Sequence, residues 1–255
     1  MPTLAIINQL LGITPRASEH AALIDNMMEF VHWFMALLFV GWTTYFIYTI
    51  IRFHKSRHPK ADYHGVRSHA STHIEFSVVL IEAVILLGFA LPLWGVRVNE
   101  IPKDTSKALV IRVVGQQYFW NFQYPGKDGV FGQSHTNLMS SSNLLGIDRN
   151  EPAAKDDIIA KDEFHVPVGR PVVLELSSKD VIHNVSLESM RIGQDCIPGL
   201  QIPVWFTPTK TGTYELICAQ LCGANHYAMK GTLVVDTEKD YEDWIDGLAQ
   251  LQIKK

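Results

Sequence analysis

Two long apolar stretches constrain the fold of this chain more than any other feature. Residues 30–51 contain no Asp, Glu, Lys or Arg and a single histidine, His32, and residues 76–96 contain one acidic residue, Glu82. At about 1.5 Å per residue, each stretch is long enough to cross the roughly 30 Å apolar core of a bilayer as a helix. We therefore predict two transmembrane helices. The alternative, two buried core helices, is weaker, because core helices seldom run this long while apolar on every side.

The charges around the two stretches predict their orientation. The connecting loop carries five basic residues against one acidic residue, Asp62, whereas the segment before the first stretch carries Arg16 against three acidic residues. The positive-inside rule places the loop in the cytoplasm and both termini outside. We expect an extracytoplasmic N-terminal segment (1–29), a helical hairpin (30–100) and an outer domain (101–255). Residues 4–13 are apolar but lack a charged segment before them, so they are not expected to be a cleavable signal peptide.

The sequence predicts β structure for the outer domain. Short β-branched or aromatic runs alternate with glycine and proline turn signals, which is typical of a sandwich or barrel. A polar stretch, residues 131–163, is expected to cross the surface, and residues 238–251 show the apolar spacing of an amphipathic helix. Strands are expected at 109–114, 118–124, 172–176, 181–187, 204–207, 213–218 and 231–235.

Charge narrows the choice of partner. The outer domain has 15 Lys and Arg residues against 19 Asp and Glu residues, and the whole chain has a formal net charge of -4. A charged partner should therefore be basic, and a nucleic-acid partner is not expected.

One group of residues has the composition of a metal site. Cys218, Cys222, His226 and Met229 follow one another at spacings of four, four and three, and His183 lies 35 residues upstream. Thiolates, imidazoles and a thioether are soft ligands that suit copper, and two bridging thiolates can hold two copper ions in a site for moving electrons. Two alternatives stay open: a Cys218–Cys222 disulfide that leaves Cys196 unpaired, and a zinc site that leaves Met229 unused.

At this point the chain resembles subunit II of haem–copper cytochrome c oxidase over nearly its whole length. The resemblance is carried by Ser178-Lys-Asp-Val-Ile-His183, Asp195-Cys-Ile-Pro-Gly199, Cys218-Ala-Gln-Leu-Cys-Gly-Ala-Asn-His-Tyr-Ala-Met229 and Gly115-Gln-Gln-Tyr-Phe-Trp120. It implies a two-helix transmembrane hairpin joined to an all-β, cupredoxin-like Greek-key sandwich that carries a dinuclear CuA copper centre.

The resemblance also assigns the ligands. Cys218 and Cys222 would bridge both coppers, His183 and Met229 would complete one ion, and His226 with the backbone carbonyl of Gln220 would complete the other. Many relatives have glutamate where this chain has Gln220, and that glutamate helps to bind magnesium next to subunit I. A neutral amide is a poorer ligand for a hard cation, so the resemblance leaves the magnesium site doubtful here.

Further roles are expected for five side chains, three of them (Tyr118, Trp120 and Glu75) implied by the resemblance. Tyr118, where many relatives have tryptophan, and Trp120 would receive electrons, with strand packing as the alternative. Glu75 would take up protons at the cytoplasmic start of the second helix, with a Thr72–Glu75 capping box as the alternative. Glu82, deeper on the same face, is expected to pair with a neighbouring subunit. Cys196 is expected to be a small buried residue.

The resemblance implies the electron-accepting subunit of a terminal oxidase in a bacterial cytoplasmic membrane. It would take electrons from cytochrome c or a similar small carrier and pass them to haem in subunit I, where oxygen is reduced to water and protons are pumped; subunit III is a further expected partner. No Cys-x-x-Cys-His occurs, so haem is expected only in the partner. The alternatives are a CuA subunit of a nitric oxide reductase and a membrane-anchored copper-delivery protein.

Overall fold

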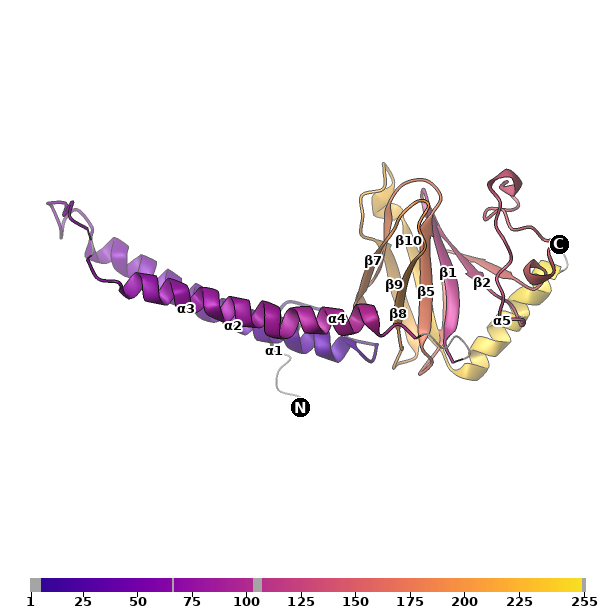
Figure 1. Ribbon diagram of the computed structural model, residues 1–255, viewed down its shortest axis with the longest axis horizontal. Coiled ribbons are helices and arrows are strands. Elements are labelled where there is room, and N and C mark those ends of the chain that lie inside the picture. Colours follow the sequence, from indigo (N-terminus) through magenta and orange to yellow (C-terminus); the bar gives the residue numbers. More distant parts are fainter. Residues whose placement is uncertain (1–5, 66, 103–106, 254–255) are drawn as a thin grey trace. The chain divides into compact units, whose positions relative to one another are not determined.

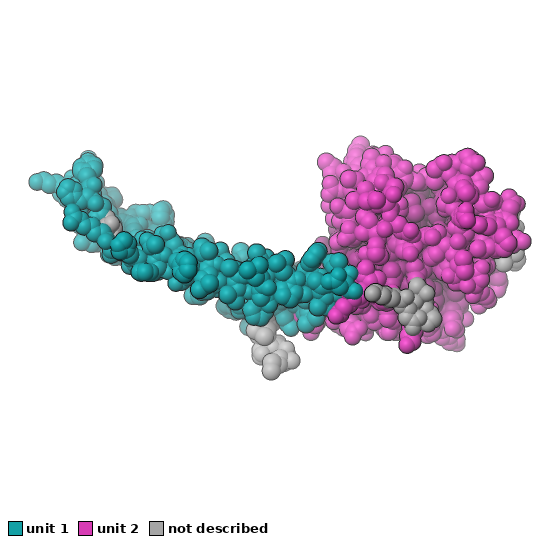
Figure 2. Space-filling view, viewed as in Figure 1, with its two compact units in different colours: residues 1–13, 23–99 teal, residues 14–22, 100–255 magenta. Residues whose placement is uncertain are grey.

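The computed structural model describes residues 6–65, 67–102 and 107–253. Clustering of contacts divides the chain into two compact units (Figures 1 and 2). One comprises residues 1–13 and 23–99 and is helical; the other comprises residues 14–22 and 100–255 and carries the β structure.

The helical unit contains both expected spans. Helix α2 (Ala21–Arg52) has 32 residues, and a second helical segment of 30 residues runs from Ala70 to Asn99; both are long and apolar enough to cross a membrane. Their apolar side chains are largely exposed, as for Phe39, which is 70% exposed. Such surfaces suit lipid contact, because water would disfavour them. A short helix, α1 (Ile6–Leu10), precedes α2.

The second segment is interrupted by a widened turn. Helix α3 (Ala70–Ile85) passes through a π-helical turn, η1 (Leu86–Ala90), into α4 (Leu91–Asn99). Pro92 has no N–H and cannot close a regular helical bond to the preceding turn, so the chain widens there.

The start of α3 corrects one expectation. The helix begins at Ala70 after His69, and no side chain caps it. Thr72 therefore lies inside the first turn, so the predicted Thr72–Glu75 capping box is wrong.

The β unit is a sandwich of two five-stranded sheets (Figure 1). Two of the strand pairs, one in each sheet, are parallel, and the other pairs are antiparallel. The predicted β-sandwich is confirmed. In spatial order, the first sheet is β3 (Ile158–Lys161), β2 (Phe119–Tyr124), β1 (Leu109–Gln116), β5 (Val172–Ser178) and β8 (Ile202–Phe206), and the second is β4 (Glu163–Pro167), β10 (Lys230–Asp236), β9 (Gly212–Cys218), β6 (His183–Leu187) and β7 (Ile192–Cys196).

Alternating side chains build the core between the sheets. Every second residue of β1 is buried, including Ile111 and Val113. The rings of Phe122 in β2 and Phe164 in β4 stack with centroids 4.5 Å apart and join one sheet to the other. Burying each ring stabilises the sandwich by about 1.5–3 kcal/mol.

Three strands were not expected. Strands β3 and β4 form around the end of the polar stretch 131–163, and β7 has no alternating pattern in its sequence, Ile-Gly-Gln-Asp-Cys. The earlier part of that stretch is irregular and has a small core of its own, made by Leu145, Ile147 and Ala154. Only β7 lacks a local strand signal and is extended because β6 pairs with it; β3 and β4 carry short apolar or alternating signals at the end of the polar stretch.

Two terminal segments pack on the sandwich. Helix α5 (Glu238–Ile253) confirms the expected C-terminal helix: Tyr241 is buried and Trp244 stacks on His165 at 4.0 Å, although Leu251 is 63% exposed and does not pack as expected. Near the other terminus, Ala17 donates its N–H to the carbonyl of Ser189 at 2.7 Å. Residues 14–22 therefore belong to the β unit.

Candidate metal centre

The sheet brings the predicted ligands together. His183 is the first residue of β6 and Cys218 is the last residue of β9, and these strands are neighbours with Val185 opposite Cys218. The loop that leaves Cys218 carries Cys222 and the short 3-10 helix η5 (His226–Ala228), and reaches Met229 just before β10. Strand pairing thus closes the 35-residue gap between His183 and Cys218.

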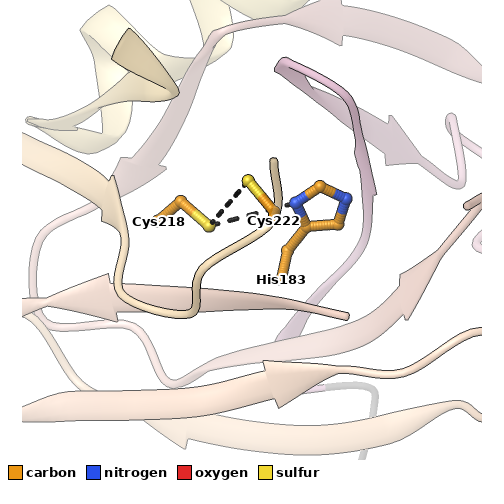
Figure 3. Close-up of side chains that lie close together, drawn as sticks. All are labelled: His183, Cys218 and Cys222. Carbon is orange, nitrogen blue, oxygen red and sulfur yellow. Dashed lines mark hydrogen bonds between the residues drawn. The ribbon is translucent and has the colours of Figure 1, made fainter. Parts of the chain in front are cut away.

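The two cysteine sulfurs lie at the middle of the cluster. Cys218 Sγ is 3.8 Å from Cys222 Sγ and 3.9 Å from His183 Nδ1 (Figure 3). Cys222 Sγ is 3.6 Å from His226 Nδ1 and 3.7 Å from Met229 Sδ. The carbonyl oxygen of Gln220 lies 3.2 Å from Cys218 Sγ. Each of the six predicted ligands therefore has its donor atom within 4 Å of a cysteine sulfur.

The donor set and its geometry fit a soft metal. A disulfide requires sulfurs about 2.05 Å apart, whereas Cys218 and Cys222 are free thiols at nearly twice that distance. His183, Cys218 and Cys222 are buried with ligand atoms within 4.8 Å of one another. Met229 is 1% exposed beside Cys222 and adds a thioether, which zinc seldom uses. Two thiolates, two imidazoles and a thioether match copper best.

Hydrogen bonds make the two thiols unequal in the metal-free protein. Burial by itself raises the pKa of Cys218, but hydrogen bonds from His183 and from the backbone of Asn184 outweigh it and lower that pKa to about 6. Burial and the neighbouring Cys218 sulfur raise the pKa of Cys222 to about 11. A metal that binds both sulfurs at neutral pH must therefore displace the Cys222 proton.

Asp180 orients His183. Its Oδ1 lies 2.8 Å from His183 Nε2, which turns Nδ1 of the same ring toward Cys218. Burial opposes the charged carboxylate, but hydrogen bonds from the Gln117 backbone N–H and from His183 lower the pKa of Asp180. Metal-binding histidines commonly donate their second N–H to such a carboxylate. Sequence reasoning missed this role, although Asp180 stands three residues before His183.

The aromatic residues of the β1–β2 region lie close to the centre. Trp120 is fully buried with its ring centroid 6.0 Å from that of His183, and Tyr118 is half-buried. Gly115 gives His183 its space, because a Cβ there would lie 2.8 Å from the imidazole ring. The electron-receiving roles of Tyr118 and Trp120 stay predictions. Cys196 is fully buried in β7, as expected.

The carboxylates predicted to act in the membrane are not part of this cluster. Glu75 and Glu82 belong to α3 in the helical unit, and both side chains are exposed. The sandwich therefore assembles the metal ligands without them.

Helices able to span a membrane and a β-sandwich with a buried sulfur and imidazole cluster define a membrane-anchored protein with a soft-metal site. Residues 109–237 match the family described as "Cytochrome C oxidase subunit II, periplasmic domain". The chain belongs to the cytochrome c oxidase subunit II family, a copper-carrying part of an oxidoreductase complex whose sandwich domain lies on the outer face of the membrane.

Individual relatives match most of the chain. "Alternative cytochrome c oxidase subunit 2" of Bradyrhizobium diazoefficiens is 30% identical over 224 residues, which cover 88% of this chain and 79% of that protein. "Cytochrome c oxidase subunit 2" of Cereibacter sphaeroides is 27% identical over 250 residues, covering 92% and 79%. The crystal structure of the periplasmic domain of subunit II from Bradyrhizobium japonicum is 28% identical, with a TM-score of 0.43, and covers 59% of this chain and 98% of that domain.

Proposed function

We propose that this chain is the electron-accepting subunit of a terminal oxidase in a bacterial cytoplasmic membrane. Its sandwich would hold a dinuclear copper centre that supplies one-electron chemistry between cytochrome c, or a similar carrier, and haem in subunit I. Reduction of oxygen to water and proton pumping would take place in that partner subunit. Convergence of two cysteines, two histidines, a methionine and a backbone carbonyl around two buried sulfurs is the observation that carries the proposal.

The ligands occur in matched pairs, which favours two ions over one. Each sulfur has an imidazole nitrogen within 4 Å: His183 beside Cys218 and His226 beside Cys222. Each also has a weaker donor nearby, the Gln220 carbonyl or the Met229 thioether. Two copper ions sharing both thiolates would supply one-electron redox chemistry. Because each sulfur would contact both ions, its neighbours do not fix the pairing, and we take from the resemblance His183 with Met229 for one ion and His226 with the Gln220 carbonyl for the other.

The protein's contribution is a rigid and dry setting. Cys218, Cys222, His183 and Met229 are each at most 7% exposed, so water has little access to the sulfurs. Strands β6 and β9 fix His183 and Cys218, and Asp180 fixes the imidazole orientation. Ligands that do not move between oxidation states keep the cost of each electron transfer low.

Two further features bear on partners. The outer domain is acidic, with 19 Asp and Glu against 15 Lys and Arg residues, which favours a basic electron carrier. Gln220 is exposed and neutral at the position where many relatives place a glutamate, so a magnesium ion shared with subunit I would lack its carboxylate from this chain.

The test is the copper content and spectrum of the full-length chain purified with its partner subunits. We expect about two copper atoms per chain and a seven-line hyperfine pattern in electron paramagnetic resonance, because the unpaired electron is shared over both ions. Cys222→Ser should abolish the shared pattern. Cys196→Ala removes the remaining buried thiol, which lies opposite His183 in the sheet but is not a proposed ligand, and should preserve it.

Three results would contradict the proposal. One copper atom with a four-line spectrum in the parent protein would exclude the dinuclear centre. Turnover of nitric oxide without turnover of oxygen by the purified complex would replace the oxidase with a nitric oxide reductase, and absence of any haem-bearing partner would favour copper delivery.

A further inference from the structure

We propose that Gln117 is a positioning residue that connects two arms of the metal centre by hydrogen bonds. The loop arm is the β9–β10 loop that carries Cys222, and the histidine arm is His183 with Asp180. This inference rests on the proposed function, because it concerns how the copper ligands are held. Gln117 lies in the turn between β1 and β2, in the first sheet, whereas His183 and the cysteines belong to the second sheet and its loop.

Its side chain holds the loop arm. Gln117 Nε2 donates a hydrogen bond of 2.7 Å to the carbonyl oxygen of Cys222, a residue 105 positions away in the chain. Cys222 stands in the middle of the irregular loop between β9 and β10, where no strand partner fixes its peptide. The amide of Gln117 therefore restrains the backbone that carries one of the two bridging sulfurs.

Its backbone holds the histidine arm. The N–H of Gln117 donates to Asp180 Oδ2 at 2.8 Å, while Asp180 Oδ1 lies 2.8 Å from His183 Nε2. One residue is thus connected, through its side chain, to Cys222 and, through Asp180, to the ring of His183. A displacement of this turn would move both arms.

Side chains of the turn pack directly against the backbone of the loop. Gly223 has φ +137°, and a Cβ there would lie 2.5 Å from the Tyr118 hydroxyl and 2.8 Å from Gln117 Nε2. Glycine at this position leaves the space that the amide of Gln117 occupies. The contact is therefore built from both sides, by the glutamine and by the absence of a side chain opposite it.

Two measurable consequences follow. The bond to the Cys222 carbonyl draws electron density away from the cysteine, so its loss should lower the reduction potential of the centre. Loss of an outer hydrogen-bond partner typically weakens metal binding by 10–100-fold, and we expect about ten-fold here because the bond reaches the ligand's backbone and not its sulfur.

The experiment compares variants of the intact, purified oxidase complex. Gln117→Ala removes the amide and leaves the backbone N–H to Asp180. Gln117→Glu keeps the carbon skeleton but sets a carboxylate against the Cys222 carbonyl. The matched control is Gln116→Ala, one position earlier, whose side-chain oxygen accepts from Lys179 Nζ at 3.1 Å. Copper affinity is measured by competition with a chelator, and the potential by spectroelectrochemical titration of the copper absorption.

We expect both Gln117 variants to bind copper about ten-fold more weakly and to show a lower potential, while Gln116→Ala matches the parent. Gln117→Ala with the affinity and potential of Gln116→Ala would overturn the inference. The number of coppers and the spectrum of the parent test the proposed function separately, since the comparison between the two glutamines can be made with whatever number of coppers the parent binds.

Discussion

At the scale of single residues, Gly223 limits how the ligand loop can be built. We predict that Gly223→Ala costs roughly 1–3 kcal/mol of unfolding free energy, because its φ of +137° disfavours a side chain and the new methyl would meet the Tyr118 hydroxyl. It should also distort the copper spectrum, because the displaced loop carries Cys222. Urea unfolding and electron paramagnetic resonance measure the two effects.

Two further variants separate backbone strain from crowding. Gly129→Ala also places a side chain at positive φ (+71°), but nothing lies within 4 Å of the new Cβ, so it should cost less and leave the spectrum unchanged. Tyr118→Phe in the Gly223→Ala background removes the hydroxyl and should recover part of the loss. Equal costs for the two glycine variants would show that crowding does not matter.

At the scale of elements, α3 brings a carboxylate to the start of the second span, the end that the charge pattern predicts to be cytoplasmic. Glu75 is exposed and is not part of a cap, because the helix begins at Ala70 without a side-chain cap. We predict that Glu75→Gln and Glu75→Ala both assemble normally with intact copper and haem. If Glu75 collects protons for subunit I, both should turn over several-fold more slowly, because neither side chain can titrate.

If Glu75 takes up protons, Glu75→Gln and Glu75→Ala should slow turnover to the same extent. This agreement distinguishes proton uptake from helix stabilisation. Glu82 lies about two turns deeper on the same helix face. Turnover of Glu82→Gln shows whether this second carboxylate also takes part in proton uptake. Normal steady-state turnover in well-assembled Glu75→Gln would exclude an essential proton role. A defect in assembly confined to Glu75→Ala would indicate a structural role instead.

At the scale of the whole molecule, charge should govern docking. The outer domain has an excess of four acidic residues over basic ones, so a basic carrier should be attracted to it over long range. We predict that the second-order rate of reduction by cytochrome c falls as ionic strength rises, because salt at about 0.1 M screens charges beyond about 10 Å.

Stopped-flow reduction at increasing salt measures this dependence, with a small uncharged reductant as the control that should not respond. A rate independent of salt would mean that the donor is neutral or permanently bound, and would remove the electrostatic argument for a basic partner.

The sequence by itself determined the two spans and the β class of the outer domain, and it pointed to the candidate metal ligands. Each of these features follows from residues that are close together in the chain. Each apolar run is long enough to span the thickness of a bilayer, and Cys218, Cys222, His226 and Met229 lie within twelve consecutive residues. The approximate positions of seven strands and of α5 followed from the same kind of signal.

Only the tertiary structure decided how those parts meet. Strand β7 lacks a strand pattern and is extended because β6 pairs with it, and the start of α3 at Ala70 left Thr72 and Glu75 outside any cap. Gln117 reaches the metal centre through hydrogen bonds to Asp180 and to the Cys222 carbonyl, across 63 and 105 residues of chain. Local pattern cannot specify such contacts, because they depend on which strands become neighbours when the two sheets pack around their shared core.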